Sequence, residues 1–155
     1  MNVSREQIAQ ALLTLLQGVN ANISYSPAYF PAGCITRAPA IFSNTPPANQ
    51  PAMFIFHPGE EASQNENYGA TKWQMVFMLL IYAKADPSRS ELPDTVVNAI
   101  LDGIERTLTP KPPYERQTLG GIVTNCYLHG MSNIDSAVIS PQIAIWQSLL
   151  VETGA

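Results

Sequence analysis

The chain contains two histidines, His57 and His129, and two cysteines, Cys34 and Cys126, and these side chains have the widest chemical repertoire. A catalytic thiol needs a base within hydrogen-bond reach. Cys126 and His129 are three residues apart in a predicted strand, so their side chains point to opposite faces. Cys34 can meet a histidine only through tertiary folding. We therefore expect two reduced cysteines that pack as small hydrophobic groups.

Metal and phosphate chemistry are equally poorly supported by the sequence. Histidines and cysteines at unrelated spacings do not supply the tetrahedral ligand set of a zinc site. Gly120 and Gly121 lack the Lys and Ser/Thr of a P-loop and do not open a predicted helix. Four acidic residues lie in predicted loops, and we interpret them as solvated surface charges rather than as catalytic groups; they are Asp86, Glu60, Glu61 and Glu66. We expect no catalytic residue, no cofactor, no metal and no enzymatic activity.

Composition indicates one domain that buries part of its surface against other subunits. The chain has 155 residues, enough for a single core. Only 13% of its residues are charged, about half the usual share. The net charge of −4 gives no basic surface for nucleic acid. The start of the chain does not resemble a signal peptide, and its longest apolar run is too short to span a bilayer. We expect a soluble protein made in a reducing cytoplasm.

The stretch from Trp73 to Ala83 predicts the central strand, because alternate positions are apolar on both faces. Such a strand belongs in the middle of a sheet that is covered on both sides. After a polar turn at Asp86-Pro87-Ser88, apolar residues recur at helical spacing from Asp94 to Leu108. Pro93 suits the first turn of that helix.

The remaining elements are shorter patterns. Ser4 to Gln17 is predicted to be a helix with a capping box, ended by Gly18. Further strands are predicted at Pro51–His57, Ile122–His129 and Gln142–Val151, with a loop over Glu60–Thr71 and a turn over Met131–Ser140. Gly120-Gly121 at a strand entrance suggests a bulge or a close backbone approach. The predicted fold is a single α+β domain, 1–155, with a mainly antiparallel sheet of about four strands flanked by two main helices.

An irregular, proline-rich segment spans residues 20 to 50. Its prolines rule out long regular elements, yet it carries too many apolar groups for a disordered tail. A short strand is plausible around Cys34 to Arg37. Long ordered loops are usually functional, and two alternatives stay open: the segment packs on its own domain or on a neighbouring subunit.

Four segments also carry a family resemblance: NQPAMFIFHPGE (Asn49–Glu60), KWQMVFMLLIYA (Lys72–Ala83), the Asp94–Leu108 helix and QTLGGIVTNCYLHG (Gln117–Gly130). In this order and spacing they resemble the tail terminator (minor tail protein U-like) family of long-tailed bacteriophages, over residues 1 to 152. The resemblance implies a structural virion protein of viral tail assembly. Its copies are expected to form a homo-oligomeric ring, commonly a hexamer, at the head-proximal end of the tail tube. That ring stops tube polymerisation and provides the surface for head-tail joining.

The implied partners are other copies of the chain, the tail tube protein and the head-tail connector or neck protein. DNA would pass through the lumen without specific binding, and no membrane is involved. The protein would be assembled in the host cytoplasm and located in the virion. Interface residues are expected in the proline-rich segment and in the Glu60–Ala70 loop; they are Tyr25, Tyr29, Phe30, Phe42, Glu60, Glu61, Asn65 and Tyr68.

Two alternatives remain from the sequence. One is a head-completion or neck protein of the same general architecture. The other belongs to a different class: a small ligand-binding or enzymatic domain with a pocket under the proline-rich segment.

Overall fold

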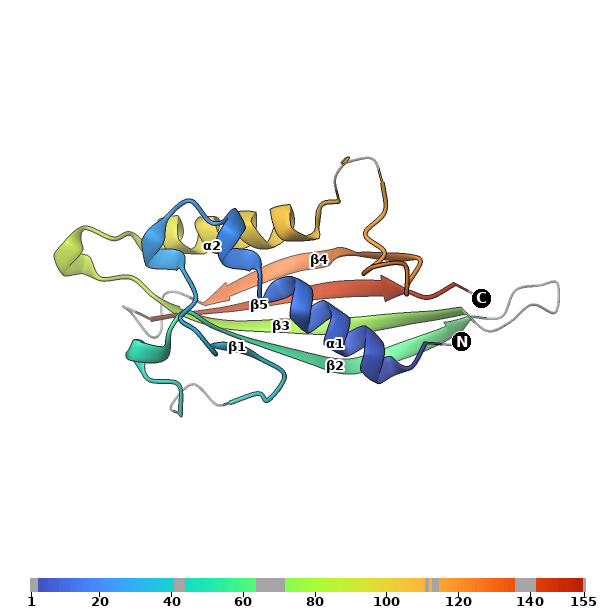
Figure 1. Cartoon of the computed structure of the whole chain (residues 1–155). Helices are drawn as coiled ribbons and strands as arrows, with labels where there is room; N and C mark the ends of the chain where they lie inside the picture. Colours follow the sequence, from blue (N-terminus) through green and yellow to red (C-terminus); the bar gives the residue numbers. More distant parts are fainter. Residues whose placement is uncertain are drawn as a thin grey trace.

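The protein folds as one five-stranded mixed sheet with both α-helices on the same side of it (Figure 1). The computed structural model describes residues 3–40, 44–63, 72–110, 112, 115–135 and 142–154. The helices are α1 (Arg5–Leu16) and α2 (Pro93–Leu108); the strands are β1 (Ile35–Thr36), β2 (Ala52–Ser63), β3 (Lys72–Lys84), β4 (Asn125–Asp135) and β5 (Gln142–Glu152). The predicted α+β class is confirmed.

The sheet order is β1-β2-β3-β5-β4, so β3 is the central strand, as predicted. It pairs antiparallel with β2 on one side and with β5 on the other along most of its length. The predicted number of strands is wrong, because β1 joins the edge of β2 in parallel. The short strand that the sequence suggested around Cys34 to Arg37 is confirmed as β1, but it was not counted among the four strands of the predicted sheet.

The predicted end of β2 is also wrong. Pro58-Gly59 was expected to be a turn, but the register with β3 only shifts between Phe56 and Gly59, and the strand continues to Ser63. A bulge accommodates Pro58 because the bulged residue need not donate to the ladder. Glu60 and Glu61 therefore lie in β2 rather than in a loop, and residues 64–71 lie outside the described part of the chain.

Strand β4 begins and ends later than the sequence indicated. It runs to Asp135 through an irregularity between His129 and Asn133, where Gly130 has a φ of 74°. The predicted turn at Met131 is thus strand up to Asp135, and residues 136–140 lie outside the described chain. Gly120 and Gly121 precede β4 in turns with φ of 78° and 91°, and a Cβ at either position would meet nothing within 4 Å. Their left-handed backbone, rather than a close approach or a strand bulge, accounts for these glycines.

Both predicted helices are confirmed. The Ser4 Oγ accepts a hydrogen bond from the Gln7 N–H, and the Gln7 side chain accepts one from the Ser4 N–H, which completes the capping box. In α2, Pro93 lies in the first turn, and the buried stripe comprises Val96, Val97, Ile100, Ile104 and Leu108. Leu101, expected in that stripe, is only half-buried. No described helix has both the length and the apolar character needed to cross a membrane.

The proline-rich segment packs largely on its own domain. The side chains of Ile23, Ala28, Phe30 and Ile35 belong to the same buried core as α1 and α2. Asn20 holds the segment in place, since its side-chain amide exchanges two hydrogen bonds of 2.9 Å with the backbone of Phe30. The first of the two alternatives for this segment is therefore correct for its described residues.

Candidate functional site

The two faces of the sheet differ sharply in how they are covered. On β3, the face toward the helices carries Met75, Phe77 and Leu79, each at most 1% exposed. The alternate residues Val76 and Met78 point away from the helices and are only half-buried. The sequence predicted that this strand is covered on both sides, and that prediction is wrong for the described chain.

Cross-strand partners share a face of an antiparallel sheet, so the ladder registers identify the rest of the outer surface. We call this surface the open sheet face. Between the strand ends it consists of Ala52, Phe54, Phe56, Gly59, Val76, Met78, Leu80, Tyr82, Tyr127, His129, Asn133, Ala144, Trp146, Ser148 and Leu150. An antiparallel sheet with one wet face normally alternates apolar and polar side chains. This outer face is predominantly apolar instead.

Part of the proline-rich segment covers one end of the open sheet face. There, Ala40 and Cys34 pack against Phe54 and Tyr82, and the Tyr82 hydroxyl donates a hydrogen bond to the carbonyl oxygen of Ala40 at 3.2 Å. Farther along the strands, Phe56, Val76 and Met78 are half-buried, and Trp146, two strands across from the covered Phe54, is 36% exposed. Larger exposed apolar patches often mark interaction sites, which makes this face a candidate contact surface.

Charged residues occur on the open sheet face only near the strand ends. By register these are Glu61, Lys72, Lys84, Asp135 and Glu152. The Tyr127 hydroxyl donates a hydrogen bond to Glu152 at 3.2 Å. Burial, followed by the negative charge of Glu152, raises the pKa of Tyr127, so this phenol stays neutral. The middle of the face is therefore uncharged, and covering it would not remove an ion from water.

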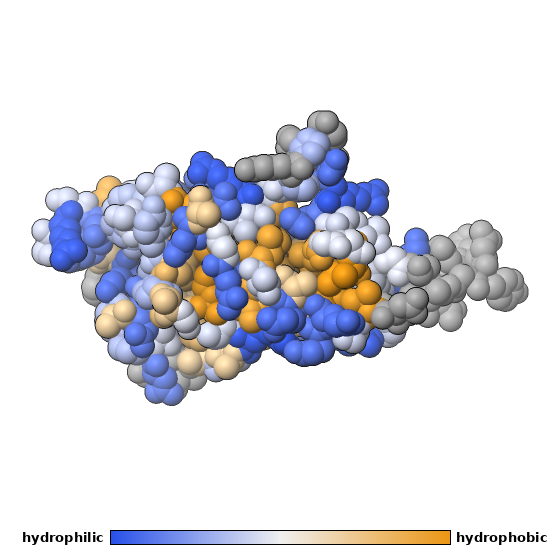
Figure 2. All heavy atoms as spheres, in the orientation of Figure 1, coloured by the Kyte–Doolittle hydropathy of each residue, from blue (hydrophilic) through white to orange (hydrophobic). Residues whose placement is uncertain are grey.

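A second apolar surface lies on the opposite side of the molecule. Figure 2 shows hydrophobic side chains at the surface between α1 and the segment that leads into β4. This hollow, which we call the α1 groove, has a volume of about 540 Å³. It is lined by Gln7, Gln10, Ala11, Thr14, Leu15, Gln117, Leu119 and Gly120, none of which carries a charge.

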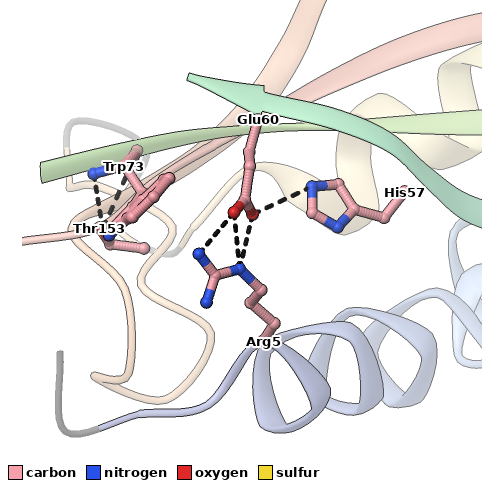
Figure 3. Close-up of polar contacts among 5 residues, drawn as sticks. All are labelled: Arg5, His57, Glu60, Trp73 and Thr153. Carbon is pink, nitrogen blue, oxygen red and sulfur yellow. Dashed lines mark hydrogen bonds and ion pairs between the residues drawn. The ribbon is translucent and has the colours of Figure 1, made fainter. Parts of the chain in front are cut away.

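A polar cluster connects the start of α1 to β2 beyond its bulge (Figure 3). The Arg5 Nε atom lies 2.7 and 2.8 Å from the two carboxylate oxygens of Glu60, and its guanidinium lies 4.6 Å from the centroid of a Trp73 ring. His57 stacks on Phe77, with its Nε2 atom 3.5 Å from the Glu60 carboxylate but outside hydrogen-bond geometry. The hydrogen bonds from Arg5 lower the pKa of Glu60. These contacts fasten the start of α1 to β2.

The cysteines are not placed for chemistry. Burial raises the pKa of the Cys126 thiol to about 12, and it also raises the pKa of Cys34. Both thiols are therefore protonated at neutral pH and are weak nucleophiles. Cys126 faces the helices whereas His129 lies on the outer face, as the sequence predicted.

The pocket beneath the proline-rich segment is small, about 200 Å³, below the usual range of ligand sites. Its lining residues are Gln17, Asn20, Phe30, Pro31, Ala32, Gly33 and Ile35, which supply no acid, base or nucleophile. Within the described ranges, no three His, Cys, Asp or Glu side chains are grouped closely enough to hold a metal ion.

The aromatic residues expected at an interface occupy different environments. Phe30, which was expected at an interface, is 4% exposed and packs in the core of its own domain. Tyr25 is half-buried and packs against the same core. Tyr29 is 44% exposed and remains a predicted contact. Phe42 lies outside the described residues.

The polar residues that were expected at an interface also lie in different environments. Glu60 is engaged by Arg5 of the same chain, whereas Glu61 is exposed at the margin of the open sheet face. Asn65 and Tyr68 lie outside the described residues. Sequence reasoning did not identify the middle of the open sheet face as a candidate contact surface, although the two-sided apolar pattern of β3 was the signal available for it.

No family model and no curated protein matches this chain. The resemblance to tail terminator proteins therefore stays a prediction that rests on the four segments themselves.

Proposed function

We propose that this chain is a structural virion protein of a long-tailed bacteriophage: a tail terminator with a tail-terminator-like fold. Its copies form a ring, in our proposal a hexamer, at the head-proximal end of the tail tube. The ring stops tube polymerisation and offers the surface to which the head-tail connector or neck protein binds. DNA passes through its lumen, and the net charge of −4 is compatible with weak interaction with phosphates.

The observation that carries this proposal is the open sheet face. The helices already cover one side of the sheet, yet Phe56, Val76 and Met78 leave an uncharged, half-exposed apolar surface on the other. Neighbouring copies in a ring would cover that surface, and the low charge content of the chain suits a protein with much of its outside in contact. A head-completion or neck protein would bury the same surface, and tail length distinguishes it from a terminator.

The test is to place a charge in the middle of the open sheet face. Met78→Lys should prevent ring formation, because a lysine there would be buried without a partner. In the isolated subunit its ammonium can still reach water, so the thermal unfolding of the variant should stay close to that of the wild type. Asn98→Lys is the matched control, since residue 98 is exposed on α2 and the charge change is identical.

Light scattering measures assembly relative to the 16.9-kDa chain, and electron microscopy measures tail length in particles made with each variant. We expect wild type and Asn98→Lys to form rings and tails of uniform length. Met78→Lys should remain monomeric and give tails of irregular length. A monomeric wild-type protein whose removal leaves tails and head joining unchanged would refute the proposal.

A further inference from the structure

His57 has a buried ring nitrogen, Nε2, that makes no hydrogen bond within the described part of the chain. This atom lies 3.5 Å from the Oε2 atom of Glu60, while the ring stacks on Phe77 with centroids 4.9 Å apart. Figure 3 shows the imidazole of His57 and the guanidinium of Arg5 both directed at the Glu60 carboxylate. A buried polar atom without a partner costs free energy, so one that faces a carboxylate requires an explanation.

We infer that His57 and Glu60 form a proton-sensitive contact that strengthens the attachment of α1 to β2 in mild acid. When the ring takes up a proton, Nε2 always carries an N–H and the imidazole becomes positively charged. A small movement of the side chain then completes a charge-assisted hydrogen bond to Glu60. The contact lies within one subunit and does not depend on the proposed ring.

The Glu60 carboxylate can accept this bond without losing Arg5. The Arg5 Nε atom lies 2.7 Å from Oε1 and 2.8 Å from Oε2, and a carboxylate offers about four acceptor positions. Oε1 also receives the closest approach of the guanidinium, through Nη2, whereas Oε2 is the oxygen that faces His57. The protonated ring would therefore add a second cationic partner to a carboxylate that Arg5 already orients.

The charges around His57 determine which form of the ring Glu60 favours. Arg5 would repel an imidazolium, but both cations contact the same carboxylate, which offsets that repulsion. Hydrogen bonds and charge from Arg5, and then the charge of His57, lower the pKa of Glu60. By linkage, ionised Glu60 favours the protonated imidazole to the same extent.

The other charged side chains on the elements beside His57 do not take part in this contact. Those of α1 and the segment after β1 bind each other at 2.6 Å, one on β2 belongs to the opposite face of the sheet, and those of β3 lie at its two ends; they are Glu6, Arg37, Glu61, Lys72 and Lys84. The proton on His57 is therefore coupled mainly to Glu60 and Arg5.

The direction of the pH dependence follows from this coupling. Because Glu60 favours the protonated ring, the contact stabilises the folded protein below the ordinary imidazole pKa of about 6.5 and is lost as the pH rises above it. Glu60 must remain ionised, and Arg5 holds its pKa below the ordinary glutamate value of about 4.3. The contact is therefore present at about pH 5.5 and absent at about pH 8.

Thermal unfolding of variants at these two pH values tests the contact. His57→Phe keeps a ring that can stack on Phe77 and removes the titrating group. The Tm gap between wild type and His57→Phe should be larger by about 1–3 °C at about pH 5.5 than at about pH 8. In a Glu60→Gln background, the gap caused by His57→Phe should be the same at both pH values. His129→Gln, at the exposed second histidine, is the matched control and should also give equal gaps.

Each Tm comparison is made at two protein concentrations, because self-association adds to apparent stability. A Tm gap that is the same at both pH values, or a pH dependence that survives Glu60→Gln, would overturn the inference.

NMR spectroscopy provides a measurement on the unmodified chain. During a titration from about pH 8 to about pH 5, the signals of the Glu60 carboxyl carbon and the Arg5 Nε–H should change together with those of the His57 ring. In Glu60→Gln the Arg5 signal should no longer follow His57. Arg5 and Glu60 signals that stay constant while His57 titrates would contradict the contact. Ring formation and tail length would be unaffected by that result, which separates it from failure of the proposed function.

Discussion

Replacing Gly103 with Ala tests how closely α2 approaches the start of the proline-rich segment. A Cβ at position 103 would lie 2.5 Å from Ile23 Cγ1, 3.3 Å from Ile23 Cδ1 and 3.6 Å from Val19 Cγ2. The nearest of these atoms is joined directly to the Cβ of Ile23, so it cannot swing away as the end of a long side chain would. Ile23 is 4% exposed and has packed neighbours around it.

Two opposing effects determine how much Gly103→Ala changes the free energy of unfolding. Alanine is favoured over glycine in a helix interior by about 0.8–1.0 kcal/mol. Inserting a methyl group into a packed core typically costs about 1–3 kcal/mol. A polar link also resists separation of the two segments, because Thr107 Oγ1 donates to the Gly103 carbonyl at 2.7 Å and accepts from Asn22 Nδ2 at 3.0 Å. The repulsion should therefore outweigh the helix preference, with a net loss of up to about 2 kcal/mol in the free energy of unfolding.

Urea unfolding of Gly103→Ala, Ile23→Ala and the double variant measures this effect. Ile23→Ala alone should cost about 2–5 kcal/mol, as for other buried aliphatic residues. The double variant should lose less than the sum of the two, because the new methyl group occupies space that Ile23 vacated. The measurement needs two protein concentrations, since self-association adds to apparent stability. A Gly103→Ala variant that is more stable than wild type by about 1 kcal/mol would refute the close approach.

Two further predictions concern titratable groups. Since Arg5 lowers the pKa of Glu60, the stabilisation from that pair is complete above the ordinary glutamate pKa of about 4.3 and is lost as the pH falls below it. The Tm gap between wild type and Glu60→Gln should therefore be present at pH 7 and close in acid, and a gap that persists at low pH would count against the pair. Cys34 is half-buried and Cys126 is buried with a pKa of about 12, so a thiol reagent at pH 8 should modify Cys34 first and Cys126 only on unfolding. Equal labelling rates in the folded protein would contradict the burial of Cys126.

The sequence was sufficient where a local pattern alone decides the structure. The capping box at Ser4 fixes the start of α1, and the 3.6-residue period after Pro93 fixes α2. The alternation in β3 and β5 matches the buried sets that these strands contribute to the core. In each case the signal and the interaction that produces it lie within the same short segment.

The errors arose where Pro and Gly have more than one structural meaning. Pro58-Gly59 and Gly130 both lie at bulges, yet the same residues also favour turns that end a strand. Only the register with the neighbouring strand distinguishes these outcomes, and that register depends on residues far away in the sequence. The short strand around Ile35 was predicted, but its parallel pairing with β2 was not, because that pairing also joins residues far apart in the sequence.

Prediction of the candidate site from the sequence is limited for a different reason. The two-sided apolar pattern of β3 predicted cover on both faces, but in the described chain only the face toward the helices is covered throughout. A strand that packs against its own helix and one that packs against another copy have the same alternation. The exposure of Trp146 and the half-burial of Met78 separate the two cases, and both depend on the folded arrangement.

The edges of the sheet support association through its faces rather than through added strands. On β2, the part beyond β1 contains Pro58, which has no N–H to donate, together with a bulge and the charged Glu60 and Glu61. On β4, the ladder is irregular around Gly130, and no described strand pairs with its outer side. Bulges, proline and charge are the features by which natural sheets prevent edge-to-edge addition. In the proposed ring, a subunit with protected edges and one open apolar face joins its neighbours without offering a growing sheet edge to further subunits, which is the behaviour that the proposed terminator function requires.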